Sequence, residues 1–159
     1  MMSTLVMYFS KTGHTRERAQ VIAQKLQADL YEIKEEVPYG AADLNWNNPA
    51  SRCNREQEDE QSRPAYQGVL PDVSRYDCIL IGHPIWWGRP PRIIDTVLEQ
   101  LHLQNSGKTL ASFATSGGST YAQSQAVMTI LLGSSAKRGR VLSNNYSIDK
   151  WLEENRLLS

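Results

Sequence analysis

The sequence predicts an α/β fold, a doubly wound five-stranded parallel sheet with helices on both faces. Short apolar runs rich in β-forming residues recur along the chain, and most precede a segment with apolar residues at helical spacing. Strands that alternate with helices form right-handed crossovers, which give a parallel sheet covered on both sides. The 159 residues fit one domain, and we expect residues 1–159 to form it.

The first third of the chain predicts a strand, a helix and a second strand. Residues 4–9 (TLVMYF) are apolar throughout, as in a strand buried on both faces. The following helix has its apolar stripe at Ala19, Ile22, Ala23 and Leu26, with Thr12 or Thr15 as its expected cap. Residues 30–34 predict a second, more exposed strand.

The next stretch, residues 35–75, is the least regular. Prolines and glycines recur in it, and a charged piece at 52–60 predicts a surface helix. A single loop of that length is unusual in a compact domain, so we expect an irregular excursion at about 38–75 with some helix of its own. Cys53 lies in a polar part of this stretch and is expected to be an exposed thiol, whereas Cys78 lies in an apolar run and is expected to be buried.

The rest of the chain repeats the alternation. Strands are predicted at 78–82, 109–114 and 140–142, and the prolines at 90 and 91 suit the start of a helix. The helical stripes are Ile94, Val97, Leu98 and Leu101, then Ala126, Val127, Ile130 and Leu131, then Ile148, Trp151 and Leu152 in a last helix from Ser147.

Composition excludes several classes of protein. The formal net charge is zero, which argues against a nucleic-acid partner, because such binding needs a positive surface. No apolar run reaches the ~20 residues of a membrane helix, and the first residues lack the pattern of a signal peptide, so we expect a cytoplasmic protein. The two cysteines and three histidines share no ligand spacing, and no metal site or catalytic side chain is predicted.

Three loops of unusual composition each follow a predicted strand, and in a parallel sheet they share one edge. The first, Ser10 to Thr15, combines hydroxyls, Gly13 and a helix start, which suits a phosphate but is equally typical of a simple helix cap. It lacks the GxxxxGK[ST] spacing of a nucleoside-triphosphate loop.

The second loop, Pro84-Ile85-Trp86-Trp87-Gly88, has adjacent indoles that a flat ring system would cover. We expect one Trp to pack on the protein and Trp87 to lie nearer the ligand. The third loop, Thr115-Ser116-Gly117-Gly118-Ser119, offers amides and hydroxyls without bulk, though such a loop is commonly just a turn. Tyr121 beyond it is expected in the core or at the rim.

The three loops resemble those of flavodoxins. Residues 8–15 (YFSKTGHT) are similar to the flavodoxin phosphate loop, and residues 113–119 are similar to the third flavin loop. Residues 76–91 resemble a strand and the following flavin loop of a bacterial branch of the family. The segments Asn54-Arg55-Glu56 and Arg63-Pro64 also resemble that branch. The resemblance covers nearly the whole chain. It implies a flavodoxin-like fold with strand order 2-1-3-4-5 and non-covalent FMN. His14 stands where this loop often has asparagine.

Carried over by position, the resemblance implies three sets of cofactor-binding residues. Ser10, Lys11, Thr12, Gly13, His14 and Thr15 would hold the phosphate; Pro84, Ile85, Trp86, Trp87 and Gly88 would line the ring; Thr115, Ser116, Gly117 and Gly118 would contact its other edge.

Three functions follow as hypotheses. The first is electron transfer by an FMN protein that is a monomer or weak dimer and serves a redox partner protein or a small aromatic acceptor. The second is an FMN-dependent NAD(P)H:quinone or azo-dye oxidoreductase, favoured by the neutral charge, because carrier flavodoxins are strongly acidic. The third, a phospho-receiver module, is disfavoured because no acidic residue ends the first or third strand.

Overall fold

A computed structural model describes residues 3–158, in which five parallel strands form one sheet. The strands are β1 (Thr4–Tyr8), β2 (Asp29–Glu32), β3 (Cys78–Pro84), β4 (Thr109–Thr115) and β5 (Arg140–Val141). Their order is β2-β1-β3-β4-β5, and every neighbouring pair is parallel. The predicted fold class and strand order are therefore confirmed.

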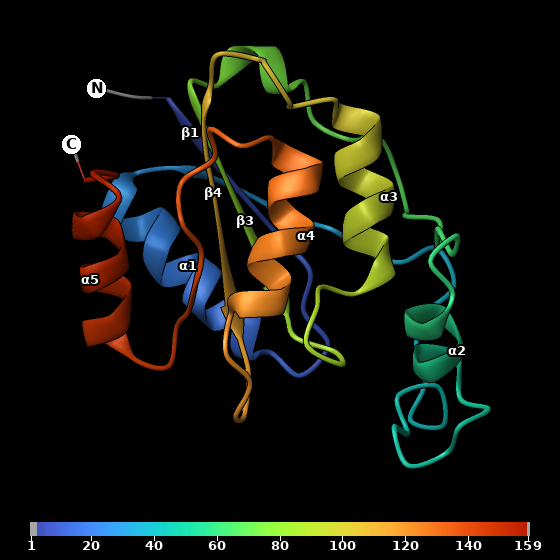
Figure 1. Ribbon diagram of the computed structural model, residues 1–159. Coiled ribbons are helices and arrows are strands. Elements are labelled where there is room, and N and C mark those ends of the chain that lie inside the picture. The colour runs from blue at the N-terminus through green and yellow to red at the C-terminus, as the bar shows by residue number, and fades with distance from the viewer. Residues whose placement is uncertain (1–2, 159) are drawn as a thin grey trace.

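Helices cover both faces of this sheet (Figure 1). They are α1 (His14–Leu26), α2 (Arg52–Glu58), α3 (Arg92–Leu101), α4 (Ala122–Leu132) and α5 (Asn145–Glu154). α1 and α5 lie on one face and α3 and α4 on the other, whereas α2 lies away from the sheet beyond the end of α3. No helix among the described residues has the length and apolar character to cross a membrane.

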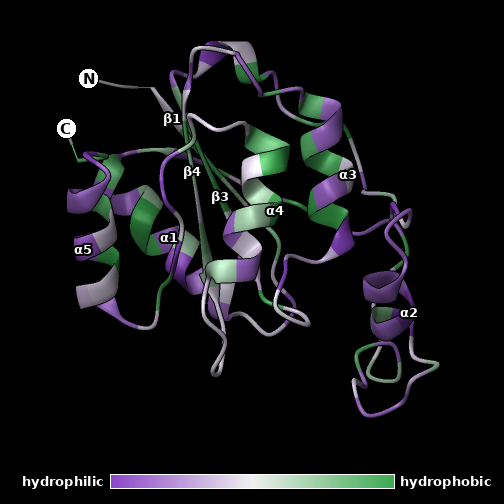
Figure 2. Ribbon diagram, viewed as in Figure 1, coloured by the Kyte–Doolittle hydropathy of each residue, from purple (hydrophilic) through white to green (hydrophobic). Residues whose placement is uncertain are grey.

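The central strands are buried on both faces because alternate side chains enter two separate cores. Leu5, Met7, Ile79 and Ile81 pack with α3 and α4, while Val6, Leu80 and Phe113 pack with α1 and α5. Figure 2 shows the same arrangement as hydrophobic colour along the central strands and a mostly hydrophilic α2.

Several helix and strand ends differ from the prediction. β2 begins at Asp29, and its register with β1 joins Leu5 to Asp29. α5 begins at Asn145 because Asn144 and Ser147 form a capping box. The expected cap of α1 by Thr12 or Thr15 is wrong: Gly13 occupies the cap position at φ 92°, and no side chain caps the helix.

The segment between β2 and β3 contains α2 and a short 3-10 helix at Val73–Arg75. Arg92 of α3 anchors the end of α2, because its Nη2 donates to the Gln57 carbonyl at 2.8 Å and its Nε to the Glu56 carbonyl at 3.2 Å. The expected exposure of Cys53 is wrong. The residue is only 5% exposed; its N–H donates to the Asp43 carbonyl at 2.9 Å, and its Sγ lies 3.5 Å from Ser51 Oγ.

Candidate functional site

The three predicted loops meet at the carboxyl edge of the sheet, after β1, β3 and β4. Thr15 Oγ1 of the first loop lies 2.7 Å from Thr115 Oγ1 of the third, and the Ile85 N–H of the second donates to the Thr115 carbonyl at 3.1 Å. Ligand sites of open α/β sheets lie at this edge, where the strand order reverses between β1 and β3.

The start of α1 is suited to an anion. The first helical hydrogen bond runs from the Glu17 N–H to the Gly13 carbonyl, so the amides of His14, Thr15 and Arg16 precede any helical acceptor. Ser10 Oγ accepts from the Gly13 N–H at 3.2 Å and thereby closes the loop before the helix. Uncapped amides and the helix dipole together attract a negatively charged group.

A cavity of about 360 Å³ opens between the three loops, and we call it the edge cavity. Eight predicted site residues line it: Thr12, His14, Pro84, Ile85, Trp86, Thr115, Ser116 and Gly117. A Cβ placed at Gly117 or Gly118 meets no atom within 4 Å, so a ligand can approach the backbone of this loop closely.

Sequence reasoning missed three residues of the edge cavity: Arg18, Leu142 and Ser143. The Arg18 guanidinium donates to the Leu142 carbonyl at 3.3 Å and to the Ser143 carbonyl at 2.8 Å. The position of Arg18, four residues after His14 on the same helix face, is the signal that could have identified it. Arg18 Nη1 also lies 2.9 Å from Glu17 Oε1, so its positive charge is paired within α1.

The tryptophan loop is a tight turn with an unusual backbone. The N–H groups of Trp86 and Arg89 each donate to the other residue's carbonyl, at 2.9 and 3.3 Å. Between them Trp87 has φ 55° and Gly88 has φ 81°, as in a type I′ turn. A left-handed conformation is unfavourable for a tryptophan, so the surroundings must hold it.

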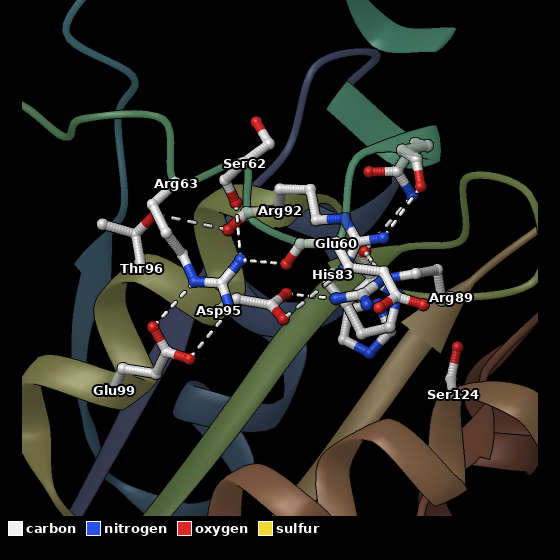
Figure 3. Close-up of polar contacts among 12 residues, drawn as sticks. Glu60, Ser62, Arg63, His83, Arg89, Arg92, Asp95, Thr96, Glu99 and Ser124 are labelled. Atoms are coloured by element: carbon white, nitrogen blue, oxygen red, sulfur yellow. Dashed lines mark hydrogen bonds and ion pairs between the residues drawn. The ribbon is translucent and has the colours of Figure 1, made fainter. Parts of the chain in front are cut away.

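Three elements hold this turn. Gln57 Nε2 of α2 donates to the Trp86 carbonyl at 2.7 Å, and Ser124 Oγ of α4 donates to the Gly88 carbonyl at 3.0 Å. Arg89 pairs with Asp95 of α3, which Arg92 approaches at 3.9 Å (Figure 3). Burial, followed by the nearby Arg89 charge, lowers the pKa of Arg92. The turn is thus fixed to α2, α3 and α4 at once.

The two indoles have different surroundings. Trp86 packs edge-on against Phe9 and Tyr39, with ring centroids 5.9 and 5.4 Å apart, and still lines the edge cavity. Trp87 is 51% exposed, and its Nε1–H donates to Asn54 Oδ1 at 2.6 Å. Trp86 is accordingly the one that packs on the protein.

A second cavity of about 260 Å³ lies beside the first and shares Thr12, Ile85 and Trp86 with it. We call it the flank cavity; Lys11, Leu44, Trp46, Cys53 and Trp87 complete its lining. Lys11 points here and not into the edge cavity, with Nζ 2.8 Å from Glu35 Oε2.

The remaining predicted residues, Ser10, Gly13, Thr15, Gly88 and Gly118, line neither cavity. Ser10, Thr15 and Gly88 use their polar atoms for the loop contacts given above. These three contacts hold the loops that border the edge cavity.

His83 and Tyr121 lie behind the tryptophan loop and are fully buried or nearly so. His83 Nδ1 donates to the Pro84 carbonyl at 2.8 Å, and its Nε2 lies 3.0 Å from the Tyr121 hydroxyl, which donates to Ser112 Oγ at 2.6 Å. Burial lowers the pKa of His83 to about 4 and raises that of Tyr121. Residues 3–158 contain no group of three or more His, Cys, Asp and Glu side chains placed to hold a metal.

Comparisons with known proteins identify the family. The sequence model of the flavodoxin family matches residues 3–155. No protein of curated function matches the chain significantly.

Among solved structures, a protein from Bacteroides eggerthii DSM 20697 assigned as a flavoprotein is 39% identical, with TM-score 0.90, over 98% of this chain and 99% of that one. A Bacteroides uniformis ATCC 8492 protein with the same assignment is 38% identical, with TM-score 0.88, over 95% and 97%. A flavoprotein from Lactobacillus acidophilus NCFM, crystallised in complex with FMN, is 27% identical, with TM-score 0.74, over 95% and 99%. With its sheet order, its edge cavity and the match over nearly its whole length, this chain belongs to the flavodoxin family.

Proposed function

We propose that this protein binds FMN without a covalent bond and transfers electrons through it. The observation that carries the proposal is the edge cavity, where an uncapped helix start, hydroxyl-bearing loops and an indole face one space. The Lactobacillus relative was crystallised with FMN, and FMN has the matching parts: an anionic tail, a polar chain and a planar head.

The donor set at the start of α1 fits the phosphate. The amides of His14, Thr15 and Arg16 and the hydroxyl of Thr12 offer neutral donors. The Lys11 ammonium group lies at the flank cavity, 2.8 Å from Glu35 Oε2.

The tryptophan loop and residues 115–118 would hold the ring system. Trp86 offers an apolar wall already fixed by Phe9 and Tyr39, and Trp87 offers a half-exposed indole. The open backbone at Gly117 and Gly118 leaves room for the polar edge of the ring.

Bound FMN supplies the redox chemistry, and the protein orients it and limits its contact with water. Among the described residues that line the edge cavity, only His14 and Arg18 carry ionisable side chains. That lining supports electron transfer, which needs no acid or base next to the ring.

Titration of FMN into the FMN-free protein tests the proposal. We expect a yellow complex and quenching of tryptophan fluorescence, because Trp86 lines the cavity. Protein that takes up no FMN at micromolar concentration would refute the proposal. Gradual reduction of the complex then shows whether a one-electron reduced state accumulates, as a one-electron carrier requires.

A second candidate function is the FMN-dependent reduction of quinones or azo dyes by NAD(P)H. The flank cavity supports it, because this cavity adds room for a small molecule beside the FMN site. Stopped-flow mixing separates the two. Rapid loss of flavin absorbance on adding NAD(P)H supports the reductase, and a stable spectrum supports the carrier.

A further inference from the structure

One long stretch of the chain contains no acidic residue. No Asp or Glu occurs between Glu99 and Asp149. The basic residues of this stretch are Lys108, Lys137, Arg138 and Arg140. It contains β4, the third loop, α4 and β5, and β4 and β5 are the last two strands at one end of the sheet. Because the net charge of the whole chain is zero, this end of the molecule is basic and the rest is acidic on balance.

Part of the basic end lies directly beside the edge cavity. Residues 119–122, at the end of the third loop, and residues 138–141, along β5, line a separate depression of about 590 Å³ together with Gln125. Both segments continue into the edge cavity, which is lined by residues 115–117 and 142–143. No carboxylate side chain of the described residues lines the depression. A positively charged surface therefore adjoins the proposed FMN site.

Arg138 is the accessible charge of this surface. Residues 138–140 also line a second depression of about 330 Å³ on the side of α5, so they form a ridge between two hollows. Arg138 is exposed, and none of the ion pairs among residues 3–158 includes it. Arg140 Nη1 lies 3.5 Å from Glu154 Oε1, but these side chains are 40% and 60% exposed, and pairs so exposed are weak.

The other side of the proposed FMN site carries the opposite charge. Glu58, Asp59 and Glu60, at the end of α2, are all exposed. α2 adjoins the site through the hydrogen bond from Gln57 Nε2 to the Trp86 carbonyl at 2.7 Å, and it lies on the side of the molecule away from α5 (Figure 1). Opposite charges on two sides of one site orient a charged protein as it approaches.

We propose that the ridge at residues 138–140 and the adjoining third loop form the docking surface for an acidic redox protein, which accepts electrons from FMN in the edge cavity. The inference rests on the proposed function and deepens it by naming the kind of partner. Carboxylates of the partner are attracted to the ridge and repelled by the end of α2, so its redox group is turned toward the third loop. In each encounter one electron passes from reduced FMN to the partner, and no bond forms or breaks.

Stopped-flow oxidation of the reduced, FMN-loaded protein by two haem proteins of opposite charge tests the inference. The acidic probe is the soluble domain of cytochrome b5, and the basic probe is cytochrome c. Each ferric haem takes one electron and becomes ferrous, which its absorbance reports. We expect the rate constant with cytochrome b5 to fall about tenfold as the ionic strength rises from ~0.02 to ~0.2 M, and that with cytochrome c not to fall.

Substitutions at Arg138 locate the effect. Arg138→Glu reverses the charge of the ridge, and Arg138→Lys keeps it. Arg75→Glu is the matched control, because Arg75 is also exposed and its carbonyl accepts from Ser3 Oγ just before β1, at the amino edge of the sheet. At low ionic strength, Arg138→Glu should slow electron transfer to cytochrome b5 about fivefold. Arg138→Lys and Arg75→Glu should be near-native, and FMN affinity should be unchanged in all three.

Each contrary result has its own meaning. Equal rates with cytochrome b5 in Arg138→Glu and Arg75→Glu overturn the inference while FMN binding stands, and so does a wild-type rate that rises with ionic strength. Oxidation by hexacyanoferrate(III), a small anion, is the third measurement. If Arg138→Glu slows this reaction and leaves that of cytochrome b5 unchanged, the ridge attracts small anions and the inference is overturned. Wild-type protein that binds no FMN overturns the proposed function itself, and the inference with it.

Discussion

Acidification from pH 7.5 to pH 5 is expected to destabilise the fold through His83. The imidazole is wholly buried and neutral, and burial lowers its pKa from 6.5 to about 4. The unfolded chain therefore binds a proton between pH 6.5 and pH 4 that the folded chain excludes, so stability falls as the pH falls through this range.

The shift sets the size of the effect. At ~1.4 kcal/mol per pKa unit, the full loss is ~3 kcal/mol, of which ~2 kcal/mol is reached at pH 5. This is a large share of the ~5–15 kcal/mol that stabilises a typical domain.

Urea unfolding followed by circular dichroism measures the effect. Carboxylates also titrate in this range, so the wild type is compared with His83→Asn at both pH values, and His102→Asn serves as the control because His102 is exposed. His83→Asn should lose ~2 kcal/mol less than the wild type between pH 7.5 and pH 5, and His102→Asn should follow the wild type. Equal losses in all three proteins would refute the buried neutral imidazole.

Three further predictions concern the site and the thiols. Thr12→Asp places a carboxylate in the edge cavity beside the proposed phosphate position. In flavin fluorescence titrations it should weaken FMN binding at least tenfold and riboflavin binding much less, because only FMN carries the repelled phosphate. Equal losses of FMN and riboflavin affinity would place the phosphate elsewhere. Trp87→Ala should cost ~1–3 kcal/mol of FMN binding by isothermal calorimetry, and an unchanged affinity would reject contact between this indole and the ring. Cys53 and Cys78 are both buried, and burial raises the pKa of Cys78 to about 11. An aromatic disulfide reagent should therefore label both thiols slowly until urea is added. Prompt labelling of one thiol in the native protein would contradict the packing around Cys53.

Local pattern was sufficient for most of the fold. The apolar run at residues 4–9 and the stripe at Ile94, Val97 and Leu98 predict a buried strand and a core-facing helix, because their period alone decides which side chains face inward. The order of these segments also implied a parallel sheet, and hence three loops at one edge. The ends of β2 and α5 were less predictable, because they depend on the register with β1 and on a cap formed by Asn144.

The sequence by itself determined the alternation of strands and helices and the order of the three loops, since both follow from contacts between residues near one another in the chain. Only the tertiary structure decided where Lys11 and Cys53 point and that Arg18 and Trp46 border the cavities. Those placements depend on partners far away in the sequence, such as Glu35 for Lys11 and Ser143 for Arg18. Local periodicity carries no information about such pairs. The long segment before β3 must fold before Asn54 can accept the hydrogen bond from Trp87 and fix that indole beside the cavities.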